Sequence, residues 1–404
     1  MFWRRAAGTI ASRFAAVPLG VIGSIVVARG LGPAGRGVFG VMMTVAAIGV
    51  QVGNLGLPSA TVYALGRDRG ALRPLLGLAL LVALGLGGAL TFAIGGLASL
   101  GHGFTTLTPG LAWLSGAWIP VGLLLLLTQT ALLGLREVRW YNGLQLAVDT
   151  GSMLVLSLCF LSGWRSPAAF YGASLAVLAA AMVMAFAQTL RHAGGRAAWP
   201  GAVLVGRTVR YGVRAYLSTL FAYLLINVDL LLVAGMLGAS EAGQYAIAAR
   251  MAEMLLLPAT AVGAILFATV SSMHSGRWAF ARRVVGAATL GLPPLLMVVA
   301  LVAKPIVRLL FGSAFLPALP PFLWLLPGVY LLSVNVQLMN FFAGTGMPAV
   351  TVIGPAAGLL ANLALNFWLI PRHGIVGAAV ASSLAYGLML AASLAHLAAG
   401  RVRS

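Results

Sequence analysis

The sequence predicts an all-α integral membrane protein, with about 12 transmembrane helices in two six-helix lobes. First, 61% of the 404 residues are apolar, 8% are charged and the mean hydropathy is +1.02. Such a chain has too little polar surface to coat a soluble globule of its size. Second, twelve segments contain the roughly 20 apolar residues that a helix needs to cross the hydrocarbon core. Third, a turn in the second half of the chain repeats one in the first half.

The twelve predicted spans are separated by connections that carry the arginines, glycines and prolines ending each apolar run. In chain order the spans cover residues 6–28, 38–63, 75–97, 111–133, 144–161, 168–190, 216–236, 242–270, 284–302, 322–342, 350–369 and 376–398. Pro18 lies inside the first span, where it predicts either a static kink or a moving hinge. The first apolar run is long and lacks a small-residue cleavage site before Arg29. We therefore expect a retained helix rather than a signal peptide.

The repeat divides the chain into an N-terminal lobe (1–190), a cytoplasmic linker (191–210) and a C-terminal lobe (211–404). Leu31-Gly32, Gly37 and Phe39 recur 206 residues later as Leu237-Gly238, Gly243 and Tyr245. A fixed spacing at the same place between two spans indicates a duplication, which is typical of transporters. Because each lobe has an even number of spans, six, the two lobes should have the same orientation in the membrane. They should be related by a pseudo-two-fold axis along the membrane normal.

A formal net charge of +19 is compatible with nucleic acid as a partner, but the distribution of the basic residues argues against that. They concentrate in alternate connections and at both ends of the chain. By the positive-inside rule, both termini and the central linker face the cytoplasm. One set comprises Arg4, Arg5, Arg67, Arg69, Arg73, Arg136, Arg139, Arg191, Arg196, Arg207, Arg210, Arg277, Arg282, Arg283, Arg401 and Arg403, and the other only Arg29, Arg36, Arg165, Lys304, Arg308 and Arg372.

No catalytic or metal-binding motif is present in the sequence. The five histidines and six acidic residues are scattered, and there is no His-Glu-x-x-His, nucleophile elbow or phosphate-binding loop. Cys159 is the only cysteine, which excludes disulfides and thiolate metal sites. An enzyme is therefore the minor alternative, and we expect no cofactor other than a coupling ion.

The few charged residues inside the predicted spans are functional candidates, because each is costly in hydrocarbon. Arg13 and Arg250 lie about two turns into their spans. They either reach a lipid headgroup or a carboxylate, as Arg250 could with Glu253 or Asp229, or line a hydrated cavity between the lobes. In the second case their guanidinium groups would grip an anionic headgroup, with Glu253 orienting Arg250. Asp149 has no evident partner and is either a cavity residue or a member of an unrecognised pair.

The segments 28–39, 227–229, 245–253 and 369–379 resemble those of the O-antigen and exopolysaccharide flippases. These belong to the multidrug/oligosaccharidyl-lipid/polysaccharide exporter superfamily. The resemblance implies a twelve-helix transporter of the bacterial inner membrane. It would move a polyprenyl-diphosphate-linked oligosaccharide to the outer leaflet by alternating access, as a monomer in contact with membrane lipids. A polysaccharide polymerase is a candidate partner. The related lipid II flippases use arginines in a central cavity, and Arg13 stands roughly where one is expected.

Two alternatives within the superfamily remain open. One is a lipid II flippase, although this chain lacks the two additional C-terminal helices of that type. The other is a cation-coupled multidrug exporter, which would favour acidic and aromatic cavity residues for cationic drugs. A diphosphate headgroup instead needs a cationic, hydrated cavity, and Arg13 and Arg250 favour that interpretation.

A monovalent cation or proton site is predicted in the C-terminal lobe from Asp229, Asn362, Asn366 and Ser382. The two asparagines are four residues apart and share one helix face, and Ser382 follows one span later. A carboxylate with three neutral oxygens suits sodium. The pattern resembles the sodium site of the lipid II flippases, except that Asn366 stands where they have a second carboxylate, so Asp229 could carry a proton instead. Alternatively, the asparagines join neighbouring helices and Asp229 pairs with Arg250.

Overall fold

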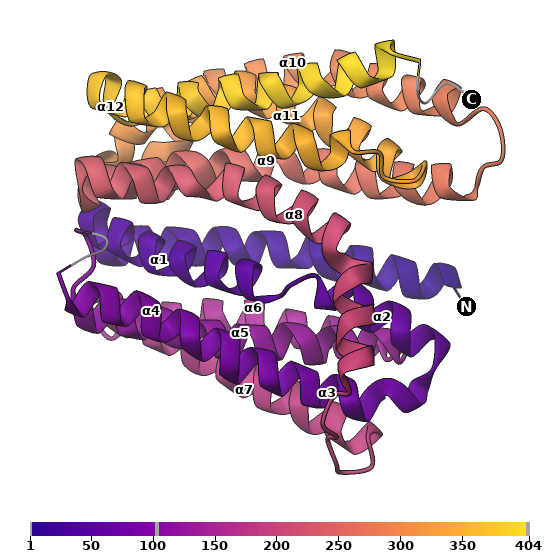
Figure 1. Ribbon diagram of the computed structural model, residues 1–404. Coiled ribbons are helices and arrows are strands. Elements are labelled where there is room, and N and C mark those ends of the chain that lie inside the picture. The colour runs from indigo at the N-terminus through magenta and orange to yellow at the C-terminus, as the bar shows by residue number, and fades with distance from the viewer. Residues whose placement is uncertain (1, 102–104, 401–404) are drawn as a thin grey trace. The chain divides into compact units, whose positions relative to one another are not determined.

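The computed structural model describes the backbone of residues 2–101 and 105–400, and the side chains of these residues except 2–17, 202–205, 207–211 and 214. The described chain is helical and divides into two compact units, unit 1 (Met1–Tyr216) and unit 2 (Leu217–Ser404). Each unit is a bundle of long apolar helices (Figure 1).

The helices of unit 1 are α1 (Phe2–Gly53), α2 (Leu57–Arg67), η1 (Arg69–Ala71), α3 (Leu72–Leu81), η2 (Val82–Leu86), α4 (Gly87–Ser99), α5 (Pro109–Gly134), α6 (Val138–Leu161), α7 (Pro167–His192) and the start of α8 (Ala202–Leu237). Unit 2 continues from α8 with α9 (Ala239–Ser272), α10 (Arg277–Leu310), η3 (Ser313–Ala318), α11 (Leu319–Gly344) and α12 (Val350–Ala398).

The long apolar helices of the described residues are compatible with the predicted twelve membrane crossings. The described residues contain 10 helical segments that are long and apolar enough to span a membrane. Two of these, in α1 and α12, contain a glycine with non-helical backbone angles, Gly32 and Gly374. The chain reverses at each of them (Figure 1), so each of these two helices is long enough for two crossings and the described part of the chain is compatible with twelve. The predicted all-α membrane fold is confirmed.

The reversals share one backbone conformation. Gly32 has φ 65° and ψ −178°, Gly238 has φ 90° and ψ −179°, and Gly312 and Gly374 have φ 96° and 59° with ψ 169° and −144°. Positive φ with ψ near 180° is essentially restricted to glycine. The Leu-Gly turn that the sequence repeats at Gly32 and Gly238 is therefore the same physical device in both units.

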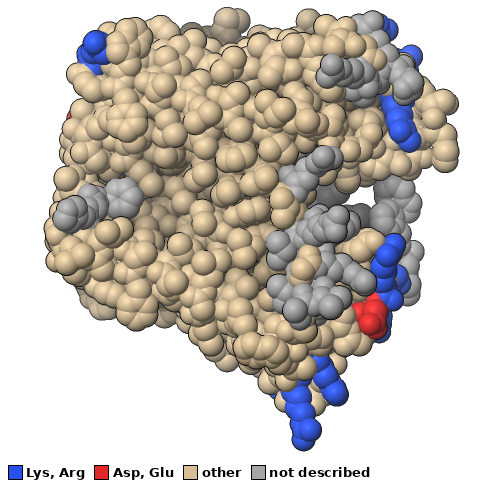
Figure 2. Space-filling view, in the orientation of Figure 1, with Lys and Arg blue, Asp and Glu red and all other residues tan. Residues whose placement is uncertain are grey.

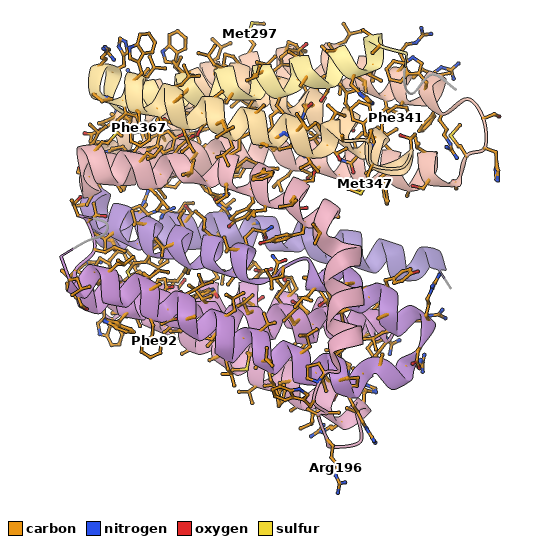
Figure 3. The ribbon with its side chains drawn as sticks, viewed as in Figure 1. Phe92, Arg196, Met297, Phe341, Met347 and Phe367 are labelled. Carbon is orange, nitrogen blue, oxygen red and sulfur yellow. The ribbon has the colours of Figure 1, made fainter. Side chains whose placement is uncertain are left out.

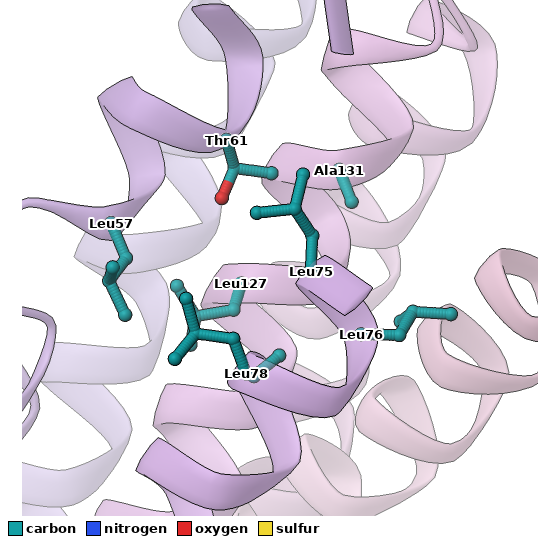
Figure 4. A pocket seen from close by; sticks show the side chains of 8 residues that line it. Leu57, Thr61, Leu75, Leu76, Leu78, Leu127 and Ala131 are labelled. Atoms are coloured by element: carbon teal, nitrogen blue, oxygen red, sulfur yellow. The ribbon is translucent and has the colours of Figure 1, made fainter. Parts of the chain in front are cut away.

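Two predicted spans of unit 1 are interrupted. The span expected over 38–63 breaks after α1, where the Asn54 Oδ1 atom accepts a hydrogen bond from the Gly56 amide at 2.9 Å and Gly56 has φ 74°. The next crossing contains a turn of π-helix, η2, between α3 and α4. A small cavity of about 10 Å³ adjoins these breaks, between α2, α3 and α5 (Figure 4). Its lining is apolar except for Thr61, so we expect it to be dry.

The segment expected as a linker is held by unit 1. Residues 193–201 are not helical, and α8 begins at Ala202, inside the predicted range 191–210. The Ala198 amide donates to the Arg73 carbonyl at 3.0 Å, and Arg73 Nε donates to the Ala193 carbonyl at 2.8 Å. The Tyr216 hydroxyl donates to the Val52 carbonyl at 2.7 Å. These contacts anchor the connection on α3 and on the end of α1.

Each unit is packed as a lipid-embedded bundle. In unit 1 the fully buried Tyr171 packs against Trp118 and Phe39, at ring-centroid distances of 5.2 and 6.3 Å. Outside the bundles, Phe92 of unit 1 and Met297 of unit 2 point away from the helices (Figure 3). On the face seen in Figure 2 the middle of the molecule is almost free of charge, and Lys and Arg lie toward its margins. This is the pattern expected of helices whose sides face hydrocarbon.

Candidate functional site

The buried polar cluster of unit 2 brings the predicted cation-site residues together. Asp229 lies on α8, Asn362 and Asn366 lie on the first crossing of α12, and Ser382 lies on its second crossing. Asp229 is 1% exposed and the other three are fully buried. Tyr245 of α9, which is also buried, completes the group. We call these five residues the Asp229 cluster.

Hydrogen-bond donors surround the carboxylate of Asp229. The Tyr245 hydroxyl donates to Oδ2 at 2.9 Å, and the Ser382 hydroxyl donates to the same oxygen. The Asn366 amide nitrogen donates to Oδ1 at 2.7 Å and to the Asn362 amide oxygen at 3.0 Å. A buried carboxylate is tolerated only when its oxygens are paired, and here donors from two neighbouring helices pair both. The cluster therefore ties α8 to α9 and α12.

The sequence places these residues through two reversals. Asn362 and Asn366 share a helix face because they are four residues apart. The reversal at Gly374 returns α12 alongside itself, which brings Ser382 back to the same region. Gly377 permits the close approach, because a Cβ atom there would collide with the Leu369 carbonyl. Glycine is required at this position by backbone contact rather than by flexibility.

The oxygen atoms of the Asp229 cluster are suitable ligands for a hard monovalent cation. The Asn366 Oδ1 atom and the Asn362 Nδ2 atom are buried without a hydrogen-bond partner. A half-turn of the Asn366 amide would put its unpaired oxygen beside Asp229 Oδ1 and Asn362 Oδ1. Oxygen ligands of this kind suit sodium.

The cluster also fits a proton. The Ser382 hydroxyl lies 3.1 Å from the Ala378 carbonyl as well as against Asp229. A hydroxyl has one proton to donate. When that proton goes to Ala378, the contact between Ser382 and Asp229 requires a proton on the carboxyl group. Sodium and a proton thus remain alternatives for this site.

Arg250 pairs with Glu253 and not with Asp229. The Arg250 Nη1 atom lies 3.2 Å from the Glu253 Oε2 atom on the same face of α9, and the two side chains are 42% and 38% exposed. The pairing of Arg250 with Asp229 that the sequence left open is wrong, because the partners of Asp229 are neutral groups. The ion pair of Arg250 with Glu253 is the arrangement observed, and the expectation that Glu253 orients Arg250 toward a substrate stays a prediction.

The two candidates in the N-terminal lobe have different outcomes. Asp149, on α6, accepts hydrogen bonds from the Gln145 amide, with its Nε2 atom 3.3 Å from each carboxylate oxygen. Of the two alternatives left open for Asp149, a cavity residue or a member of an unrecognised pair, the structure shows the pair, with the partner one turn away on the same helix. Arg13 lies outside the described side chains, and its place in a shared cavity with Arg250 stays a prediction.

Sequence reasoning missed Tyr245 as a member of the site. An aromatic residue inside an apolar span usually belongs to the packed core. The sequence comparison therefore identified Tyr245 only as the counterpart of Phe39 in the repeat. The difference between those two residues is a hydroxyl group. That hydroxyl is the atom that contacts Asp229. The signal that could have identified Tyr245 is the polar atom that it carries where the other copy of the repeat has the apolar Phe39.

The two bundles of long apolar helices with their glycine reversals have the fold of solved transporters of the multidrug/oligosaccharidyl-lipid/polysaccharide exporter superfamily. A lipid II flippase, MurJ, in an inward closed conformation matches with a TM-score of 0.81 at 14% identity, covering 96% of this chain and 87% of that one. An inward-facing multidrug-resistance transporter matches with a TM-score of 0.76 at 15% identity, covering 96% and 94%. A transporter of this superfamily from Pyrococcus furiosus has a TM-score of 0.67 at 15% identity, covering 99% and 94%.

The chain belongs to the family described as polysaccharide biosynthesis protein, whose model matches residues 26–320. The family resemblance predicted from segments such as 28–39 is confirmed. An uncharacterised membrane protein of Methanocaldococcus jannaschii is 32% identical over 96 residues, which are 24% of this chain. The match spans about a fifth of that relative's own length, 19%.

Proposed function

We propose that this protein moves a polyprenyl-diphosphate-linked oligosaccharide from the inner to the outer leaflet of the bacterial cytoplasmic membrane. One observation carries the proposal: a transporter fold occurs in a family of polysaccharide biosynthesis proteins. A transporter contributes to biosynthesis by carrying an intermediate across the membrane. Intermediates built on a lipid in one leaflet and used in the other need such a step, because a charged diphosphate does not cross hydrocarbon unaided.

Arg250 is the described residue best suited to hold the diphosphate. Its guanidinium group has five N–H donors, and Glu253 engages only the Nη1 atom at 3.2 Å. The remaining donors are available to phosphate oxygens, which a guanidinium binds through paired hydrogen bonds. The ion pair with Glu253 holds one edge of the Arg250 guanidinium group and leaves its other edge available to a ligand. Arg13 is proposed as a second cationic contact.

The Asp229 cluster is proposed as the coupling site. It joins three helices through one carboxylate, so a change in its ligand changes how α8 is held against α9 and α12. Sodium would take the place of the hydrogen-bond donors around Asp229 and be shared among the oxygen atoms of the cluster. A proton on Asp229 would reverse the direction of its hydrogen bond with Ser382, so that the carboxyl group donates and the hydroxyl accepts. Either event redistributes the hydrogen bonds between helices. Alternating access needs an equilibrium of this kind that a bound ion can shift.

The role of Arg250 is tested in cells that lack their own copy of this gene. Arg250→Ala and Arg250→Gln should abolish surface polysaccharide while the protein stays at normal abundance in the membrane. Arg282→Ala removes an exposed arginine from α10 and is the matched control, with export retained. Full export by Arg250→Gln would mean that the charge is not needed, and that Arg250 serves only its pair with Glu253.

The coupling ion is tested on purified protein. Sodium should raise the melting temperature of the wild type in a saturable way relative to choline chloride, and Asp229→Asn should remove the increase. Equal melting temperatures in the two salts would rule out sodium and leave the proton. In that case, transport by reconstituted protein should follow an imposed pH gradient in the wild type, and Asp229→Asn should abolish this response.

A second candidate substrate is lipid II, because the match to the lipid II flippase covers 96% of this chain. Both substrates carry a diphosphate on a polyprenyl tail, so Arg250 serves either. Reconstituted protein distinguishes them directly: the proposed function requires faster flipping of an oligosaccharide-linked lipid than of lipid II. A polysaccharide polymerase as partner and a monomeric state remain part of the proposal. Co-purification and mass photometry of the detergent-solubilised protein test them.

A further inference from the structure

A groove of about 270 Å³ lies on the outside of unit 1, between α6 and α7. It is lined by Arg139, Trp140, Gly143, Leu144, Ala147 and Met184. The α6 residues follow one another at helical spacing, so the groove runs along the helix axis from the N-terminal end of α6. From residue 139 to residue 147 it extends about 12 Å, most of the roughly 15 Å depth of one hydrocarbon leaflet.

The groove has a charged end and an apolar remainder. Arg139 is exposed at the first turn of α6 and makes no ion pair with any residue that the structure describes. Trp140, 41% exposed, is next to it, at the level where tryptophan marks the membrane interface. Below them Gly143 and Ala147 leave the helix surface open, and Met184 forms the opposite wall.

Further positive charge gathers at the same end of this helix pair. Arg136 is exposed just before α6, and Arg191 is exposed at the end of α7. Leu144 of α6 belongs to the same buried cluster as Ala181 and Ala185 of α7. Because consecutive helices joined by a short connection are antiparallel, the end of α7 lies at the level of the start of α6. The nearby acidic residue is Glu137, which precedes α6 and forms no ion pair within the described residues. The basic residues outnumber it.

We propose that this groove binds an anionic glycerophospholipid of the surrounding bilayer. The phosphate would lie against Arg139, with Arg136 and Arg191 adding to the potential, and one acyl chain would follow the groove past Gly143 and Ala147. An anionic headgroup is favoured over a zwitterionic one, because the latter brings a cation to an end already rich in arginine. This site lies within unit 1 and is independent of the diphosphate contact proposed at Arg250.

Native mass spectrometry of the full chain, delipidated in detergent, tests the site with phosphatidylglycerol and with phosphatidylcholine of the same acyl chains. The wild type should bind the anionic lipid more tightly. Arg139→Ala should weaken that binding about fivefold, the effect of one basic residue near an anionic headgroup. Arg282→Ala, which removes an exposed arginine from α10 of unit 2, should not change it.

Filling the groove without changing its charge is the sharper test. A Cβ atom at Gly143 meets nothing within 4 Å, so Gly143→Leu fits the fold and should block the acyl chain. Gly291→Leu, at an equally open position on α10, is the matched control and should leave binding unchanged. The melting temperature reports that each variant is folded. If Gly143→Leu lowers it, Ala147→Leu fills the same groove from an exposed position.

Several results would overturn the proposal. Equal binding of the two lipids, or full binding of the anionic lipid by folded Gly143→Leu or Ala147→Leu, would show that only surface charge is involved. Displacement of the lipid by inorganic phosphate would assign the site to a free anion. Displacement by a polyprenyl phosphate at equal concentration would assign it to the transport substrate rather than to a bilayer lipid.

Discussion

Removing the hydroxyl group of Tyr245 measures whether Asp229 carries a charge. Tyr245→Phe deletes the donor that lies 2.9 Å from Asp229 Oδ2, at a side chain only 3% exposed. Hydrogen bonds to a charged group contribute about 1.5–3 kcal/mol, and neutral ones about 0.5–1.5 kcal/mol. Tyr171→Phe is the matched control, because its buried hydroxyl donates to the neutral Ser115 carbonyl at 3.1 Å.

The energy ranges of hydrogen bonds to charged and to neutral groups meet at about 1.5 kcal/mol. The charge on Asp229 is therefore tested by a double-mutant cycle. Tyr245→Phe is measured in the wild type and in Asp229→Asn, where the acceptor is neutral, by reversible unfolding in detergent. If the carboxylate is charged, the cost of Tyr245→Phe should fall by about 1 kcal/mol or more in the second background, since contacting residues are coupled. Tyr171→Phe should cost the same in both backgrounds, because it contacts neither residue.

The same variants can be followed by thermal unfolding. For a domain the size of unit 2, each kcal/mol shifts the melting temperature by about 2–4 °C, so Tyr245→Phe should lower it by about 3–12 °C. An identical cost of Tyr245→Phe in both backgrounds would refute the reasoning. That result would mean that Asp229 is neutral in the folded protein, and the proton interpretation of the site would then replace the sodium one.

Two other predictions concern packing and topology. Gly377→Ala should lower stability by about 1–3 kcal/mol and reduce surface polysaccharide, because its methyl group meets the Leu369 carbonyl, whereas Gly387→Ala, with its nearest contact 3.5 Å away, should be neutral or slightly stabilising. A melting temperature for Gly377→Ala equal to that of the wild type would contradict this. Reporter fusions at Arg196 and at Ser404 should both give a cytoplasmic signal, and an external signal from either would mean that the orientation is misassigned.

The spans could be predicted from sequence because burial in hydrocarbon acts on every residue of a helix and so accumulates over about 20 positions. Breaks within a span depend on single residues, and they were missed for that reason. The interruption of the span 38–63 depends on Asn54 and Gly56, where one side-chain hydrogen bond and one positive φ end the helix. The hydropathy of the segment hardly changes at these two positions.

The candidate site was predictable where spacing within a helix determined it. Asn362 and Asn366 share a face by periodicity alone, and both contribute to the Asp229 cluster. The hydrogen-bond partners of Asp229 depend on contacts between helices, and the spacing of residues within one helix does not predict those contacts. Arg250 was available to either carboxylate by sequence, and the structure pairs it with Glu253.

The reversals also explain why the cluster exists at one depth. Asn366 precedes Gly374 by eight residues and Ser382 follows it by eight, so both lie about 12 Å along their helices from the turn. Asp229 precedes Gly238 by nine residues and Tyr245 follows it by seven, which brings them to nearly the same depth below their own turn. Two glycine reversals therefore align the four residues near the middle of a core about 30 Å thick.

The two positions of unit 1 that correspond by the repeat to Asp229 and Tyr245 carry neither a carboxylate nor a phenol. Shifting back by 206 residues places Gly23 at the position of Asp229 and Phe39 at that of Tyr245. The Phe39 ring instead packs edge-on against Tyr171, and a Cβ atom at Gly23 would lie 3.7 Å from the Leu156 side chain. A carboxylate introduced at Gly23 would thus meet an apolar neighbour and no phenol. The duplicated turn is common to both units, whereas Asp229 and Tyr245 have no polar counterpart at these two positions of unit 1. On the proposal that the Asp229 cluster is the coupling site, we therefore expect one coupling ion for each transport cycle.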